Sequence, residues 1–157
     1  MSDNIKKVSL EAFEPLIREK LSSGGTVQIP ITGTSMLPLL VQGRDSVILS
    51  PASEIKINDI IFYKRDDGHF VLHRVVGKDN KGYILCGDNQ WVKEYGITDQ
   101  HIIGVVTEMI CDGINKKVDD ADYIKYCNRL TKTMPIRKPL VKILSKTRAI
   151  KRKMSSR

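Results

Sequence analysis

The feature that most constrains the fold is a series of short β-branched and aromatic runs between residues 26 and 109, each bounded by turn-forming residues. The turns at residues 66–68 and 79–82 are only a few residues long, which is typical of antiparallel hairpins. This pattern predicts strands over residues 26–31, 46–49, 60–63, 69–76, 83–86 and 102–108. Short strands with short links indicate a mainly β fold, namely a coiled antiparallel sheet or a barrel.

Helices are expected on both sides of this β unit. Apolar residues at helical spacing predict an amphipathic helix over residues 8–22, in which Pro15 indicates a later start or a kink. Residues 119–130 and 139–154 are predicted to form two more helices. A chain of 157 residues, 41% of them hydrophobic, suits one domain with a single core. We therefore expect an N-terminal helix at 1–25, a β core at 26–112 and a helical, basic C-terminal extension at 113–157.

The cysteines and the lengths of the apolar runs indicate the cellular compartment of the protein. The three cysteines form no Cys-x-x-Cys pair, so we expect buried thiols in a reducing compartment rather than disulfides. Together with the three histidines they show no zinc-ligand spacing, and a metal site is not expected. No apolar run approaches the roughly 20 residues of a membrane span, and acidic residues interrupt any N-terminal secretory signal. We expect a cytoplasmic protein.

The net charge of +8 is concentrated in the C-terminal part of the chain. Residues 123–157 hold 12 basic and no acidic residues, whereas residues 1–122 hold 14 basic and 18 acidic ones. The segment 139–157 has the composition of a helix that could lie on an anionic inner membrane face, and a solvated tail is the alternative. Nucleic-acid binding is not expected, because no helix-turn-helix, zinc finger or aromatic platform accompanies the charge.

One turn between two predicted strands has the composition of a nucleophile site. Residues 31–40, Ile-Thr-Gly-Thr-Ser-Met-Leu-Pro-Leu-Leu, place Ser35 after a flexible glycine. A nucleophilic serine needs a tight turn where its hydroxyl is exposed and nearby main-chain N–H groups can hold an oxyanion. Because Gly-x-Ser alone is equally typical of a surface turn, Ser35 is a candidate that needs partners.

His73 is the candidate base, in a strand that is otherwise apolar. On strand alternation it shares a face with Val71 and Val75, while Arg74 points to the opposite face. An apolar face disfavours the imidazolium, and a neutral imidazole can take the serine proton near neutral pH. The alternative is a strand histidine with a purely structural role.

A carboxylate could orient His73 through its far ring nitrogen. The turn Cys-Gly-Asp-Asn-Gln at residues 86–90 supplies Asp88, and Glu94 follows it. Either carboxylate could hold the productive tautomer and stabilise the charged imidazole during reaction. Asp88 could instead form an Asx-type turn, so both candidates stay open.

Taken in this order, the segments resemble type I signal peptidases and the related LexA-like self-cleaving proteins. The matching segments are residues 33–38 (Gly-Thr-Ser-Met-Leu-Pro), 43–48, 58–63, 73–75 (His-Arg-Val) and 87–89 (Gly-Asp-Asn). Bacterial signal peptidases carry Lys-Arg-Val in the base-bearing strand, and the endoplasmic-reticulum type carries His-Arg-Val, as this chain does. In that type a catalytic aspartate follows Gly-Asp-Asn, at the place that Glu94 occupies here.

The resemblance implies a serine endopeptidase that hydrolyses a peptide bond without a cofactor. Ser35 would be the nucleophile and His73 the base. The oxyanion hole would rest on the Ser35 N–H, helped by Thr34, because Gly33 replaces the serine that signal peptidases carry there. Met36 and Pro38 would contact the substrate, a peptide or a precursor protein.

Two other functions remain open from the sequence. An inactive peptide-binding module could use the same groove, as could a self-cleaving regulator of the LexA-like kind. The regulator is less favoured, since only one predicted helix precedes residue 26 and a DNA-binding domain is not expected there. A membrane anchor is likewise not expected, so the work of a signal peptidase on exported proteins does not transfer by resemblance alone.

Overall fold

The structure of the protein, a computed structural model, describes residues 10–136 and has the mainly β architecture that the sequence predicts. The strands are β1 (Val27–Pro30), β2 (Ser46–Ser50), β3 (Ile60–Lys64), β4 (Phe70–Asp79), β5 (Gly82–Cys86), β6 (Glu94–Ile97), β7 (Ile102–Cys111) and β8 (Ile114–Lys117). The helices are α1 (Leu10–Ser22), α2 (Ala121–Thr133) and a short 3-10 helix at Met134–Ile136. The helix predicted over 139–154 and the basic segment 139–157 lie outside the described residues.

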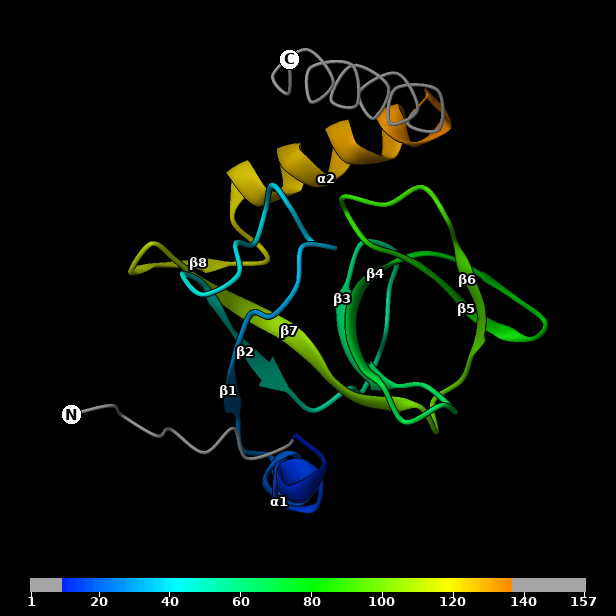
Figure 1. Ribbon diagram of the computed structural model, residues 1–157. Coiled ribbons are helices and arrows are strands. Elements are labelled where there is room, and N and C mark those ends of the chain that lie inside the picture. Colours follow the sequence, from blue (N-terminus) through cyan, green and yellow to red (C-terminus); the bar gives the residue numbers. More distant parts are fainter. Residues whose placement is uncertain (1–9, 137–157) are drawn as a thin grey trace, which may run out of the picture.

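The strands form one antiparallel sheet with the order β1-β2-β7-β3-β4-β5-β6, to which β8 adds along β7. β7 is ten residues long and serves both halves: its first residues pair with β3 and its later ones with β2. Register shifts in both pairings bend the sheet. In Figure 1, β3 to β6 therefore curl round with the start of β7, while β1, β2 and the end of β7 form a second layer.

β3 lies between two hydrophobic cores and contributes side chains to both. Its alternate residues enter different cores: Ile60 and Phe62 belong to one, and Ile61 and Tyr63 to the other. The first core also takes Ile17 and Leu21 from α1 and Tyr123 and Cys127 from α2. The second core fills the curled part of the sheet, and also holds Val75, Tyr83, Leu85, Ile97 and Ile102.

The structure extends the sequence prediction in three places. β6 and β8 were not predicted, because β6 contains Gly96 at φ +76° and every residue of β8 is exposed, so neither shows a clear period-two pattern. Within the described residues, α1 covers Leu10–Ser22 and passes through Pro15 without ending. All three cysteines are buried thiols, as expected. Neither α1 nor α2 is long and apolar enough to span a membrane.

Asp45, a buried carboxylate before β2, fixes the segment that follows the serine turn. Its oxygens accept hydrogen bonds from the Val41 N–H at 2.7 Å and the Asp112 N–H at 3.1 Å, and its side chain pairs with Arg44 at 2.7 Å. The Arg44 hydrogen bond, opposed by burial and assisted by both N–H groups, lowers the pKa of Asp45 from 3.8 to about 2. Asp45 therefore stays ionised at all ordinary pH values.

We predict that Asp45→Asn lowers the free energy of unfolding at pH 7 by about 1–3 kcal/mol, since it weakens buried hydrogen bonds to a charged acceptor. The pKa of Asp45 is about 2 in the folded protein and 3.8 as the ordinary value. The ionised carboxylate therefore stabilises the folded state fully above pH 3.8, and this stabilisation is lost as the pH falls through about 2. The stability gap between wild type and variant should therefore narrow from pH 4 to pH 2 in urea titrations. A gap that stays constant, or one that Glu54→Gln on the surface reproduces, would contradict this assignment.

Candidate active site

Ser35 lies in an irregular turn between β1 and β2 that a second turn supports. Gly33 has φ +77°, a left-handed conformation that favours glycine, and its N–H donates to the Gln42 side chain at 3.0 Å. The Asn89 N–H donates to the Ser35 carbonyl at 2.8 Å, and the Asn89 amide donates to the Thr34 carbonyl at 3.1 Å. The Gly-Asp-Asn turn, which follows β5, thus binds the main chain of the serine turn through two hydrogen bonds.

Gly87 must be glycine for these two turns to touch. A Cβ atom added there would lie 2.6 Å from the Ser35 carbonyl oxygen, which is closer than any side chain could approach the main chain. The glycine in Gly-Asp-Asn is therefore needed for the close approach of the serine turn.

His73 occupies the middle of β4, opposite Ile61 of β3, and only 4% of its surface is exposed. Its Nδ1 atom lies 3.2 Å from the Tyr63 hydroxyl and 3.9 Å from Glu94 Oε2. Burial lowers the pKa of His73 from 6.5 to about 4, against the opposing effect of the Glu94 charge. The ring is therefore neutral at pH 7, as the apolar strand face predicted.

The Tyr63 hydroxyl decides which nitrogen of His73 carries the proton. It donates its own hydrogen to Glu94 Oε2 at 2.7 Å, so towards His73 it can only accept. His73 must then hold its proton on Nδ1 and leave Nε2 with a free lone pair. Burial, followed by the bond to Glu94, raises the pKa of Tyr63, which keeps the hydroxyl protonated as this arrangement requires.

Nε2 of His73 is not fully buried. Every fully buried side-chain nitrogen and oxygen among residues 10–136 has a hydrogen-bond partner, and Nε2 has none within these residues. Nε2 therefore keeps some exposed surface, and His73 lines two pockets.

Arg65 holds Glu94 in the ionised state. Its guanidinium donates two hydrogen bonds to the carboxylate, at 2.8 Å to Oε1 and 2.7 Å to Oε2. Burial by itself would raise the pKa of Glu94, but the hydrogen bonds from Arg65 and Tyr63 outweigh it, so the pKa is lowered. A fixed negative charge therefore lies next to the protonated side of His73.

Asp88, the other carboxylate that the sequence suggested, serves Arg74 instead. Arg74 donates to both Asp88 oxygens, at 2.8 Å and 2.7 Å, and both side chains are almost fully buried. The Arg74 guanidinium also donates to the Asn58 carbonyl and the Tyr123 hydroxyl, each at 2.8 Å. Of the two alternatives, Glu94 is the carboxylate beside the His73 ring, and Asp88 belongs to an ion pair behind the site.

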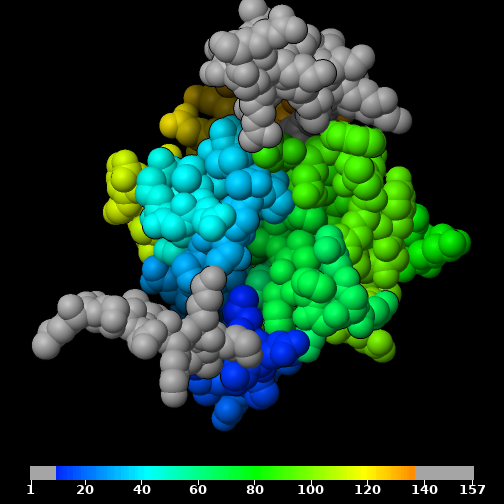
Figure 2. Space-filling view, viewed as in Figure 1, coloured from blue at the N-terminus to red at the C-terminus, as the bar shows by residue number. Residues whose placement is uncertain are grey.

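Ser35 and His73 line the same pocket, a cavity of about 320 Å³ between the serine turn and β4. Its other walls are mainly apolar and include Ile29, Ile31, Met36, Phe62, Phe70 and Leu72. In Figure 2 the light blue and cyan atoms of the serine segment meet the green atoms of β3 to β5 along this side of the molecule. Of the two predicted substrate contacts, Met36 lines the pocket from a buried position, whereas Pro38 is exposed and lies outside its wall.

The hydroxyl and the N–H of Ser35 are both available for chemistry. Neither group has a hydrogen-bond partner among the described residues, and this includes His73. Catalytic hydrogen bonds are often long in ligand-free enzymes and shorten when substrate binds. Thr34 is exposed, and its carbonyl accepts a hydrogen bond from the Asn89 side chain.

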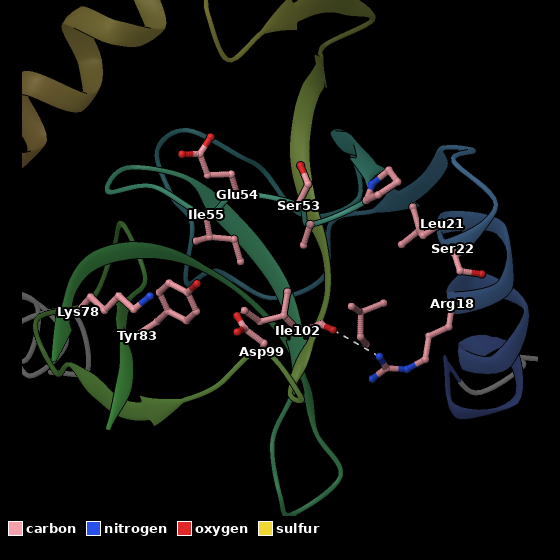
Figure 3. Close-up of a pocket in the computed structure, with 13 residues that line it drawn as sticks. Arg18, Leu21, Ser22, Ser53, Glu54, Ile55, Lys78, Tyr83, Asp99 and Ile102 are labelled. Carbon is pink, nitrogen blue, oxygen red and sulfur yellow. Dashed lines mark hydrogen bonds between the residues drawn. The ribbon is translucent and has the colours of Figure 1, made fainter. Parts of the chain in front are cut away.

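Two other cavities lack Ser35. One of about 570 Å³ is lined by residues 89–94 and shares Arg65, His73 and Gln90 with the serine pocket. The cavity in Figure 3, of about 630 Å³, lies beside α1 with Arg18, Glu54, Lys78 and Asp99 spread around it. It contains neither Ser35 nor His73, which leaves the smaller serine pocket as the site with a complete set of groups.

Sequence reasoning missed Tyr63 and Arg65, although a signal existed. Tyr63 pairs with Val71, so it is the diagonal neighbour of His73 on the same face of the sheet. That relation depends on the register between β3 and β4, which the short turn at residues 66–68 constrains but does not fix.

The comparison with known families agrees with this geometry. A family model described as Peptidase S24-like matches residues 4–107, which include α1, β1 to most of β7 and all the candidate residues. The chain belongs to the Peptidase S24-like family, and thus to the superfamily of LexA-like and signal-peptidase-like proteins. No curated protein and no solved structure matches the chain.

The ion pair between Arg74 and Asp88 yields a stability prediction. Removing one partner leaves the other charge buried, so Asp88→Leu or Arg74→Met alone should lower the free energy of unfolding by about 3–5 kcal/mol. The double variant should lose less than the sum of the single variants, because it leaves no unpaired charge. Urea unfolding of all three variants checks this, and additive losses would show that the ion pair is not coupled.

Proposed function

We propose that the protein is a serine endopeptidase in which Ser35 is the nucleophile and His73 the general base. The observation that carries this proposal is that Ser35 and His73, far apart in the chain, line one pocket. Its specific form is the Ser-His arrangement of the endoplasmic-reticulum type, with Glu94 in the place of the aspartate.

The reaction follows from the positions of these groups. The Ser35 hydroxyl attacks the peptide carbonyl and gives its proton to His73 Nε2, while the Ser35 N–H donates to the oxyanion. The imidazolium that forms keeps its Nδ1–H directed at the Tyr63 oxygen, and the Tyr63 hydroxyl donates its own hydrogen bond to the Glu94 carboxylate. His73 then protonates the leaving amine, and a water molecule, activated by the same nitrogen, hydrolyses the acyl-enzyme.

The substrate proposed for this site is a peptide or a precursor protein with apolar side chains near the cleaved bond. The serine pocket has mostly apolar walls, and it shares Leu10, Ile29 and Pro30 with a second apolar groove between α1 and β1. The amine that leaves takes its proton from His73, so this part of the peptide must lie next to His73. The cavity lined by Trp91 and Val92 also adjoins His73 and could hold it. The mechanism needs no cofactor.

A peptide-binding module without catalysis is the second candidate. The observation in its favour is that no hydrogen bond joins the Ser35 hydroxyl to His73 in the described chain. Such a module would bind peptides through the same pocket, and Ser35→Ala would leave that binding intact.

Reaction with a fluorophosphonate probe separates the two candidates. We predict that the wild-type protein forms a covalent adduct at Ser35, located by mass spectrometry, and that Ser35→Ala forms none. His73→Ala should react about 100- to 10,000-fold more slowly, because a general base contributes on that order. Circular dichroism controls for folding. A folded wild-type protein that does not react, yet binds peptides, would favour the binding module.

The position of Tyr63 gives a second prediction on the same reaction. Tyr63→Phe removes the acceptor of the Nδ1 proton, so labelling should slow by about 10- to 100-fold. Tyr83→Phe, in the same hydrophobic core, is the matched control and should react like wild type. Equal rates for the two variants would exclude a role for Tyr63.

The pH profile of labelling provides an independent check of the base. Since His73 must be neutral to act, the rate should rise with a midpoint near pH 4 and stay level to pH 8. A midpoint near 6.5, the ordinary value, would mean that the base is not the buried His73.

A further inference from the structure

α2 lies beyond the family match, which ends at residue 107, yet its side chains reach the supports of both candidate catalytic residues. The Tyr126 hydroxyl donates to Asp88 Oδ2 at 3.0 Å. One turn earlier, the Tyr123 hydroxyl lies 2.8 Å from the Arg74 guanidinium. Figure 1 shows α2 across one end of the molecule, beside β8 and near the ends of β3 and β4.

These contacts end next to the reacting side chains. Asp88 precedes Asn89, whose N–H and side chain hold the carbonyls of Ser35 and Thr34. Arg74 follows His73 on β4, and the Arg74–Asp88 ion pair joins the two positions. α2 therefore contacts an ion pair that links the Gly-Asp-Asn turn, and with it the serine turn, to β4.

The contacts of α2 also complete the hydrogen bonding of a buried ion pair. Arg74 is 1% exposed, and α2 supplies two of its contacts, the Tyr123 hydroxyl and the Cys127 sulfur at 3.2 Å. A buried charge is tolerated when its remaining donors and acceptors are satisfied. Without α2, the Tyr126 hydroxyl would no longer bind Asp88, and water would enter beside it.

We propose that α2 is part of the active centre and that Tyr126 is a positioning residue, which fixes the Gly87–Asn89 turn and through it the Ser35 main chain. The effect on the reaction rests on the proposed peptidase function. The effect on the turn does not, because it concerns hydrogen bonds present without substrate. Tyr126 acts on the orientation of Ser35 and the oxyanion N–H, and it leaves the ionisation of His73 to Tyr63 and Glu94.

The test compares Tyr126→Phe, which removes one hydroxyl, with Leu130→Ala, which truncates a buried apolar side chain of α2 and removes no hydrogen-bonding group. Tyr126→Phe should lower the maximal rate of fluorophosphonate labelling about 3- to 30-fold. This is less than the roughly 10- to 150-fold of a whole hydrogen bond to a charged group, because Tyr126 acts on Ser35 only through the turn. The probe concentration at half-maximal rate and the pH midpoint should stay unchanged, because binding and His73 are not altered. Leu130→Ala should label at the wild-type maximal rate at a temperature where both variants are folded.

Hydrogen exchange measured by mass spectrometry tests the same link without any activity. Tyr126→Phe should speed exchange in peptides that cover residues 33–37 and 86–90 by at least threefold, whereas Leu130→Ala should speed it mainly within α2. If the wild type does not label but these exchange rates change as expected, the peptidase proposal fails and the positioning role stands. Unchanged exchange in both peptides, or equal losses of labelling rate in the two variants, would overturn the positioning role.

Discussion

The buried ion pair between Arg74 and Asp88 is the interaction on which the rest of the site depends. Taking two charges out of water costs several kcal/mol for each ion, and excellent geometry is needed to offset it. Here the two side chains form paired hydrogen bonds, and the Asn58 carbonyl, Tyr123 and Tyr126 satisfy further donors and acceptors. Because each partner adjoins a residue of the site, an ion pair with this strict geometry also fixes the distance between strand and turn.

Two neighbouring residues of β4 have different roles: Arg74 belongs to the buried ion pair, and His73 is the proposed base. Strand alternation sends Arg74 towards α2 and His73 towards the second core, where Tyr63 and Glu94 meet it. The two carboxylates are divided in the same way, since Asp88 binds the arginine and Glu94 lies beside the histidine. Each carboxylate is held by its own arginine, so neither is free to exchange roles.

The sequence was sufficient for the β architecture because its strands alternate clearly and its hairpin turns are short, as at residues 66–68. It also identified Ser35 and His73 as the pair that one pocket brings together. It could not choose between Asp88 and Glu94, because that choice depends on the curl of the sheet and on strand register. Tyr63 was hidden for the same reason: on a strand buried on both faces, nothing local distinguishes a packing tyrosine from one that binds a histidine.

Burial of His73 would have opposite effects on the two halves of the proposed reaction. It keeps the imidazole neutral and ready as a base throughout the neutral range, but it makes the imidazolium of the reaction expensive to form. A fixed anion nearby reduces that cost, and Glu94 lies 3.9 Å from Nδ1 with the Tyr63 hydroxyl bridging the two groups. Because hydrogen bonds from Arg65 and Tyr63 lower the pKa of Glu94, this compensation is present at neutral pH. The rate at neutral pH should therefore depend on the Arg65–Glu94–Tyr63 chain rather than on pH.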